Sequence, residues 1–150
     1  MDLQLAGKTA VVTGGSRGIG KAIARALAME GVDVALVGRD TGALSAAASE
    51  IGAASGRKVI SLAGDTGDEA SVKAMAADAI ANLGGRVDIL VNCAAKPGGQ
   101  GKPPRYDEVS KEELFDHVNV KVMGYLRTAQ AFAPGMKANG FGRIVNVSGL

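Results

Sequence analysis

The chain has 150 residues, which fits one domain, and a hydrophobic fraction of 47% allows a sizeable core. Only 3% of the residues are aromatic, so aliphatic side chains must fill that core, and 22 glycines mark turns or close backbone approaches. A formal net charge of +2 with scattered basic residues argues against a nucleic-acid-binding protein.

Apolar runs alternate with helix-like stretches along the chain. The β-branched run Thr9–Thr13 predicts a buried strand, and Gly18–Met29 has the apolar spacing of a helix. Further strands are predicted at residues 32–37, 58–63, 87–92 and 143–148, and further helices at residues 41–54 and 68–83.

Two segments between the last two strands differ from this pattern. Residues 96–106 are rich in Gly and Pro and predict a mobile loop. Ser110 and Glu113 then form a capping box, which predicts the start of a long helical region that ends near Gly140.

The alternating order predicts an α/β fold, a doubly wound parallel sheet of the Rossmann type with helices on both faces. We expect one dinucleotide-binding domain over residues 1–150. An apolar strand at residues 143–148 without a covering helix is a liability for a folded protein. The chain is therefore expected to be the N-terminal portion of a longer single-domain fold whose C-terminal strands follow Leu150, or to pair this edge with another subunit.

A glycine-rich loop joins the first predicted strand to the first helix. Its glycines allow a sharp turn close to a pyrophosphate, and the free N–H groups of the helix start can meet the negative oxygens. A plain tight turn is the alternative for such a loop taken alone. The expected cofactor-binding residues here are Gly14, Ser16, Arg17, Gly18, Ile19 and Gly20.

The segment Thr13–Gly20 resembles the cofactor signature of the short-chain dehydrogenase/reductase family, in its non-extended branch. The resemblance continues through Asp65, residues 92–95, Asn119 and the strand at residues 143–148. It departs from the family at Cys93 and Ala95. The resemblance implies an enzyme similar to 3-oxoacyl-acyl-carrier-protein reductases, which works as a homodimer or homotetramer, and an atypical member is an open alternative.

The residue after the second predicted strand bears on the choice of cofactor. An acid at that place binds the ribose 2′-hydroxyl of NAD, roughly 20 residues beyond the loop. This chain has Gly38 and Arg39 there, and a guanidinium suits a 2′-phosphate, which Arg17 can also reach. NADP(H) is therefore favoured over NAD(H). The alternatives are solvated arginines or a pair between Arg39 and Asp40.

The resemblance also assigns residues after the third and fourth strands. Asp65 would accept a hydrogen bond from the adenine amino group, with Thr66 beside it, although Asp65 could merely start a turn. Asn92 and Ala94 would steady the sheet and border the ribose. Cys93 is expected to be a small core residue, since no partner suggests a nucleophile.

The resemblance implies a Tyr as acid or base with a Lys four residues later, a Ser that positions the carbonyl, and an Asn that holds a water. Asn119 stands where the family has its Asn. Gly149 stands at the usual Ser, so Ser148, one residue earlier, could serve only if the strand ends there and the backbone turns. The Tyr and Lys pair is expected beyond Leu150.

The favoured function is an NADP(H)-dependent oxidoreductase that reduces a small-molecule carbonyl or oxidises a secondary alcohol by hydride transfer. A nucleotide-binding relative without efficient hydride chemistry is the alternative, motivated by Gly149. A structural subunit is a third, weaker possibility. Apolar residues of the long helical region exceed what one sheet face needs and predict a subunit contact: Leu114, Val118, Val122 and Leu126.

The remaining features exclude other classes of protein. Cys93 is the only cysteine, so an internal disulfide is impossible and a reducing cytoplasm is expected. One His and one Cys do not make a metal site, and His117 is expected on a helix surface. No basic leader precedes an apolar segment, and no stretch approaches the roughly 20 apolar residues that span a bilayer, so we expect no membrane segment.

Overall fold

A computed structural model of the chain describes residues 3–96 and 104–148. One sheet of five parallel strands has the order β3-β2-β1-β4-β5. Its strands are β1 (Thr9–Thr13), β2 (Asp33–Gly38), β3 (Val59–Ala63), β4 (Ile89–Asn92) and β5 (Arg143–Asn146). The connections run outward from β1 in both directions, so the predicted doubly wound sheet of the Rossmann type is confirmed.

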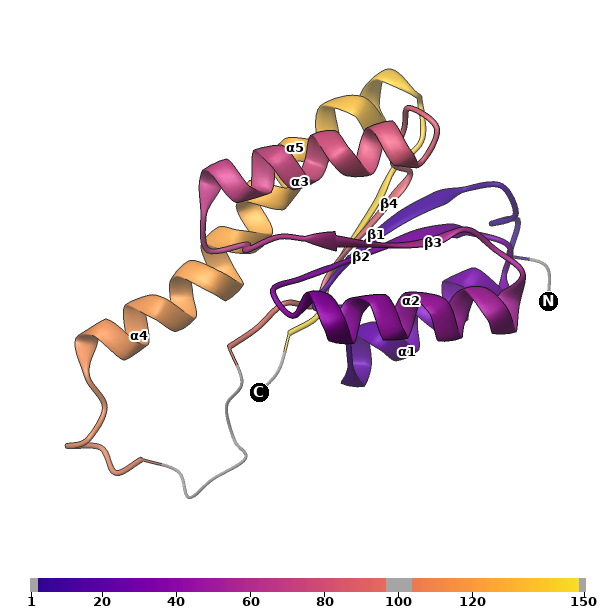
Figure 1. Cartoon of the computed structure of the whole chain (residues 1–150). Coiled ribbons are helices and arrows are strands. Elements are labelled where there is room, and N and C mark those ends of the chain that lie inside the picture. Colours follow the sequence, from indigo (N-terminus) through magenta and orange to yellow (C-terminus); the bar gives the residue numbers. More distant parts are fainter. Residues whose placement is uncertain (1–2, 97–103, 149–150) are drawn as a thin grey trace.

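Helices cover both faces of this sheet (Figure 1). One layer holds α1 (Gly18–Met29) and α2 (Thr41–Ser55), and the other holds α3 (Glu69–Asn82) and α5 (Gly124–Ala138). α4 (Lys111–Val118) extends away from the sheet and buries none of its residues. No helix in the described residues is long and apolar enough to cross a membrane.

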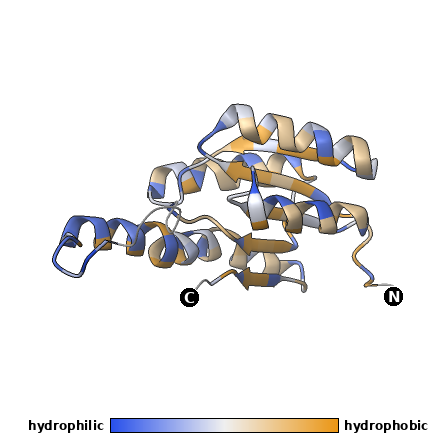
Figure 2. Cartoon of the chain, turned by 90° about the horizontal axis from the view of Figure 1, so that it is seen from below, coloured by the Kyte–Doolittle hydropathy of each residue, from blue (hydrophilic) through white to orange (hydrophobic). Residues whose placement is uncertain are grey.

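The core divides into two clusters because successive strand residues point to opposite faces. From β1, Ala10 and Val12 pack with α1 and α2, whereas Val11 packs with α3 and α5. The strands consequently read as continuous apolar runs, which is typical of a parallel sheet covered on both sides (Figure 2). The aliphatic core that composition predicts is present, with Phe132 as its largest fully buried side chain.

The strands are shorter than predicted at the ends of β4 and β5, and side chains explain the difference. β4 begins at Ile89 instead of residue 87, since the Asp88 carboxylate accepts from the Thr9 backbone N–H at 3.0 Å. Beyond β5, the Val147 carbonyl accepts from the Tyr125 hydroxyl at 2.8 Å. The Ala94 N–H turns to Thr13 instead, so the ladder between β4 and β5 stops.

The long predicted helical region is not one regular helix. Ser110 caps its start as predicted, with its hydroxyl accepting from the Glu113 N–H at 3.1 Å. A five-residue π-helical turn, η1 (Asn119–Met123), then separates α4 from α5. Most of the predicted Gly/Pro loop, residues 97–103, lies outside the described residues.

Candidate functional site

A cavity of about 1100 Å³ lies at the carboxyl ends of the strands, slightly above the usual range for small-molecule sites. Ligands of open α/β sheets bind in this crevice, where connections leave β1 in opposite directions. Ten of the predicted cofactor-binding residues line it: Gly14, Ser16, Arg17, Gly18, Ile19, Gly20, Arg39, Asp65, Thr66 and Ala94.

The glycine-rich loop is held against β2 and against the helix that follows it. The N–H groups of Gly14 and Gly15 donate to the Val37 carbonyl at 2.8 and 3.3 Å. A Cβ on Gly20 would lie 2.2 Å from the Gly14 carbonyl oxygen, which no side chain can tolerate. Gly18 has φ +55° and open space where a Cβ would stand, so the mouth of α1 is clear.

The first turn of α1 has no side-chain cap, in contrast to the first turns of α2, α3 and α4. Side chains of Asp40, Asp68 and Ser110 accept backbone N–H groups at the starts of α2, α3 and α4. Arg17 stands at the same position of α1 and makes no such bond. The N–H groups of a first helical turn have no partner within the helix, and together they attract an anion. The cavity therefore has an anion-attracting wall.

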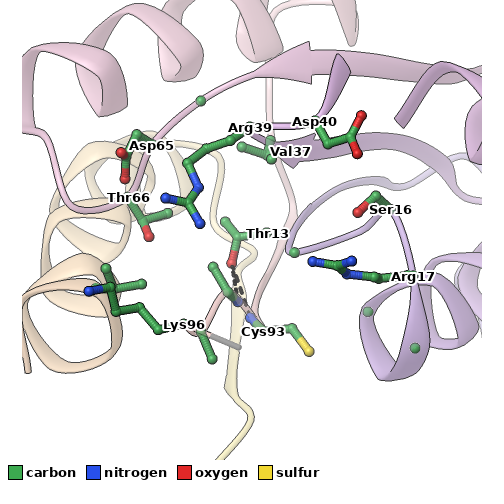
Figure 3. Close-up of a pocket in the computed structure, with 18 of the residues that line it drawn as sticks. Thr13, Ser16, Arg17, Val37, Arg39, Asp40, Asp65, Thr66, Cys93 and Lys96 are labelled. Atoms are coloured by element: carbon green, nitrogen blue, oxygen red, sulfur yellow. Dashed lines mark hydrogen bonds between the residues drawn. The ribbon is translucent and has the colours of Figure 1, made fainter. Parts of the chain in front are cut away.

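Thr13 fixes the floor of the cavity. Its side chain is fully buried, and its hydroxyl oxygen accepts from the N–H groups of Cys93 at 3.0 Å and Ala94 at 3.1 Å. The same hydroxyl donates to the Val91 carbonyl at 3.4 Å. The ends of β1 and β4 are thus joined by one side chain, as the dashed lines of Figure 3 show.

Two arginines line the cavity from different elements. Arg39 directly follows β2, as predicted, and lies toward Asp65 and Thr66, whereas Arg17 lies on the side of Ser16 (Figure 3). The Asp40 carboxylate accepts from the Ala43 N–H at 3.0 Å, so it caps α2. Within the described part of the chain, neither arginine forms an ion pair, and both guanidinium groups are available to an anion.

Asp65 and Thr66 form the wall opposite the glycine-rich loop, two residues beyond the end of β3. One carboxylate oxygen of Asp65 accepts from the Gly67 N–H at 2.8 Å, which folds the segment into a tight turn. The Asp65 N–H donates to the Ser71 hydroxyl at 2.9 Å. Asp65 thus does start a turn before α3, and it lines the cavity as well.

Asn92 does not line the cavity, in contrast to the expectation that it binds the cofactor. Its side chain is fully buried, where it donates to the Asn146 side chain at 2.9 Å and accepts from the Thr128 hydroxyl at 2.6 Å. These bonds tie β4 to β5 and α5. Its observed contacts therefore steady the sheet behind the cavity, which is the other part of the role implied by resemblance.

The two predicted catalytic residues also lie outside the lining of the cavity. Asn119 is half-buried at the start of η1, and its amide hydrogen-bonds to Gly67 and Arg127. Ser148 is exposed and follows the end of β5 at Asn146, so the strand ends before it, which is one of the two conditions for Ser148 to serve. Gly149, which stands at the usual Ser position, lies outside the described residues.

Other lining residues were not anticipated as binding residues: Val37, Gly38, Gly64, Ala95, Lys96 and Val120. Most of them neighbour predicted residues in sequence and could have been inferred from them. Val120 directly follows Asn119, but its apolar side chain gave no reason to expect it in the lining, and only the fold brings η1 to the cavity. Lys96 forms an ion pair with Asp116 of α4, so its ammonium is partly neutralised.

Cys93 packs against the core but also lines the cavity, so the expectation of a core residue is confirmed only in part. Burial raises the pKa of the Cys93 thiol, and the charge of Lys121 opposes this shift. Burial likewise raises the pKa of Tyr125. Both groups are therefore neutral at pH 7, and neither is prepared to act as a nucleophile or base.

The described residues contain no cluster of His, Cys, Asp and Glu that could hold a metal ion. His117 is exposed on α4, as predicted. The site chemistry is consequently that of an anion pocket with a polar floor, two carboxylates from Asp40 and Asp65, and two guanidinium groups that form no ion pair with the described residues.

The sheet order, the helices on both faces and the cavity at the strand ends define an α/β fold of the Rossmann type. A sequence model of the family described as short chain dehydrogenase matches residues 8–150. The chain belongs to the short-chain dehydrogenase/reductase family, as the resemblance predicted.

Similar proteins include a D-threitol dehydrogenase from Mycolicibacterium smegmatis, 37% identical over 98% of this chain and 54% of the relative. A glycine betaine reductase, ATRR, from Emericella nidulans is 40% identical over 96% of this chain and 11% of the relative. Among solved structures, L-sorbose reductase from Gluconobacter frateurii with NADPH and L-sorbose has a TM-score of 0.86 at 36% identity. A metagenomic short-chain oxidoreductase with NADP has a TM-score of 0.86 at 40% identity.

The structural match covers 96% of this chain but 53% of the sorbose reductase chain, and 97% against 64% for the metagenomic oxidoreductase. The chain therefore spans between about half and two thirds of the length of these two structures. The described cavity corresponds to that half of the fold.

Proposed function

We propose that the cavity binds NADP(H) and that the whole protein transfers a hydride between this cofactor and a small carbonyl compound or secondary alcohol. The family of the chain and the NADPH and NADP complexes of two similar structures support this proposal. The observation that carries it is the coincidence of an uncapped helix start with two unpaired guanidinium groups at one mouth.

Each part of the cavity suits one part of the cofactor. The open first turn of α1, with Gly14, Ser16, Gly18, Ile19 and Gly20 around it, suits the pyrophosphate.

The guanidinium of Arg39, supported by Arg17, suits a 2′-phosphate, because its fork matches the phosphate oxygens. The Asp65 carboxylate suits the adenine amino group, with Thr66 behind it. Ala94 borders the ribose, and Asn92 holds the strand on which this border stands.

When bound, the nicotinamide supplies or accepts the hydride. The chain's own part is to orient the cofactor by these contacts. Ser148, beyond the end of β5, is the residue of the described chain that we propose to position the carbonyl oxygen.

The cofactor assignment is tested by replacing Arg39 with Asp in the full chain. A charge-assisted hydrogen bond contributes about 1.5–3 kcal/mol to binding. Its loss should therefore weaken NADPH binding roughly 10–100-fold. The new carboxylate would accept from a 2′-hydroxyl, so NADH binding should improve and the preference should reverse. Fluorescence titration with both cofactors measures this.

Arg25→Asp is the matched control, because Arg25 is exposed on α1 and does not line the cavity. It should leave the ratio of the two affinities unchanged. An unchanged ratio in Arg39→Asp itself would contradict the 2′-phosphate assignment.

A second candidate is a relative that binds the nucleotide but transfers hydride poorly. Gly149 at the usual Ser position favours it, because glycine offers no hydroxyl to a carbonyl. Oxidation of NADPH in the presence of a panel of carbonyl compounds separates the two. Tight NADPH binding without turnover of any of them would favour the second candidate.

We also propose that the protein is a homodimer or homotetramer. Large apolar side chains are exposed along α4, η1 and α5, and they recur every fourth residue: Leu114, Val118, Val122 and Leu126. This spacing keeps them on one helical stripe, and contiguous exposed apolar stripes are typical of subunit contacts.

A further inference from the structure

The segment 65–67, which carries the wall opposite the glycine-rich loop, packs directly on η1 and on the first residue of α5. Thr66 is buried, and a Cβ on Gly124 would lie 3.0 Å from three atoms of Thr66. A Cβ on Gly67 would lie 3.2 Å from the Asn119 amide nitrogen. The backbone of this wall therefore has no room to move toward the helix, and its position depends on that of the π-helical turn.

The π-helical turn has an unusual set of acceptors. The Asn119 carbonyl accepts the N–H of Gly124, five residues on, because the turn is wider than an α-helical one. Arg127, which begins the second turn of α5, donates from Nη1 to the same carbonyl at 3.2 Å. Its Nη2 donates to Asn119 Oδ1 at 2.8 Å.

The same guanidinium also reaches the cavity wall. Arg127 Nη1 donates to the Thr66 carbonyl at 3.1 Å, and Asn119 Nδ2 donates to the Gly67 carbonyl at 3.0 Å. One arginine and one asparagine thus bind two successive carbonyls of the wall and each other. Both atoms of the Asn119 amide have partners in the protein, and it is the next residue, Val120, that lines the cavity.

We propose that Arg127 is a positioning residue for cofactor binding, which acts through Asn119 to fix the Asp65–Gly67 turn at the adenine end of the cavity. This assignment rests on the proposed function. In this proposal, Asn119 stabilises the backbone of the cofactor site through its hydrogen bonds to Gly67 and Arg127. A planar guanidinium is suited to this task, because its donors form a rigid fork that a single ammonium cannot reproduce.

The proposal predicts that loss of Arg127 affects only the adenosine end of the ligand. The wall carries the Asp65 carboxylate, whereas the N–H groups of Gly14 and Gly15 in the loop donate to the Val37 carbonyl, and the hydrogen bonds of Arg127 go to Thr66 and Asn119. Loss of Arg127 should therefore weaken contacts to adenosine and leave those to the pyrophosphate in place.

The test uses the full chain with Arg127→Met, with Asp65→Asn and with both changes, titrated with 2′,5′-ADP and with NADPH. We expect Arg127→Met to weaken 2′,5′-ADP binding roughly tenfold, since it removes charge-assisted hydrogen bonds from the wall. The double variant should bind no worse than the weaker-binding single variant, because Arg127 positions the turn that presents the Asp65 carboxylate, and Asp65→Asn has already removed that carboxylate. Losses that multiply would overturn the proposal.

Turnover provides a second readout, which general damage to the fold would not reproduce. The KM for NADPH should rise in Arg127→Met while kcat stays within about twofold, because the lost contacts serve binding of the cofactor and not the reacting atoms. A fall of kcat at unchanged KM would overturn the proposal. Lys137→Met, which removes an exposed cation from the same helix, should change neither constant.

If Arg127→Met does not fold, Arg127→Lys keeps the charge and the aliphatic stem but loses the fork. It should show the same rise in KM at smaller size, and normal constants would overturn the proposal. Failure of the unchanged protein to bind either NADPH or 2′,5′-ADP would instead refute the proposed function. Normal binding by both the unchanged protein and the Arg127 variants would refute only this inference.

Discussion

Gly20 is the residue at which α1 touches the loop that precedes it. Replacing it with Ala would place a methyl group 2.2 Å from the Gly14 carbonyl oxygen, and both partners are backbone. The loop must then shift, which we expect to destabilise the fold by about 1–3 kcal/mol as overpacking does. Because the shifted loop forms the cavity mouth, NADPH binding should weaken as well. Thermal unfolding measures the loss of stability, and titration measures the loss of binding.

Gly56→Ala is the control for that change. Gly56 ends α2 with φ +67° and has open space around it, so Ala is strained there without meeting any neighbour. Stability should fall by about 1 kcal/mol while NADPH binding stays unchanged. Equal affinities in the Gly20 and Gly56 variants would show that the loop tolerates displacement.

For single residues, the sequence predicts those whose position depends on their neighbours along the chain. The glycines of the loop and Arg39 follow from spacing along the chain, and the cavity lining contains them. The contacts of Asn92 and Arg127 did not follow, since their partners are 36 and 61 residues away in sequence. A single sequence does not indicate which distant carbonyl a buried amide or guanidinium will meet.

At the scale of the helices, one glycine substitution should raise the free energy of unfolding instead of lowering it. Gly135 lies inside α5 with nothing near the position of a Cβ, so Ala can replace it without a clash. Alanine loses less conformational entropy in a helix, and Gly135→Ala should raise the free energy of unfolding by about 0.5–1 kcal/mol. Chemical denaturation measures the gain.

Gly142→Ala serves as the contrasting variant for Gly135→Ala. A Cβ on Gly142 would lie 2.5 Å from the Met136 side chain, so this change should lower stability instead. A loss of stability in Gly135→Ala would mean that α5 is constrained at this position by something other than its own backbone.

Element boundaries were predictable where the backbone alone decides them, as at β1 and α1, whose predicted and observed limits agree. They were not predictable where side chains intercept the ladder, as Asp88 does at the start of β4 and Thr13 does where the pairing of β4 with β5 ends. The π-helical turn was also missed, because apolar spacing continues through it and one wider turn changes that spacing very little.

The whole molecule presents an apolar stripe that its own sheet does not cover. α4 extends from the body in both views (Figures 1 and 2). Farther along the stripe, Leu126 and Val122 are 48% and 60% exposed. If this stripe joins subunits, a charge in its middle should separate them. We expect the unchanged full chain to sediment as a dimer or tetramer and Leu126→Asp to sediment as a smaller species.

Ala77→Asp, at an exposed position of α3, is the control and should leave the sedimentation coefficient unchanged. Sedimentation of the unchanged full chain as a monomer would refute the proposed assembly. The fold class itself needed no such test, since the alternation of strands and helices predicts it and the observed sheet order agrees.

The bare start of α1 has a cost that the other helices do not carry. An Asp or Ser in place of Arg17 would cap the helix as Asp40 and Asp68 cap theirs, and it would set a competing oxygen where a ligand's own oxygens belong. A capping substitution that would raise stability at this position is therefore incompatible with binding of an anion there. Stabilising substitutions would have to lie elsewhere in the chain, because a cap at this position would oppose binding of the anion.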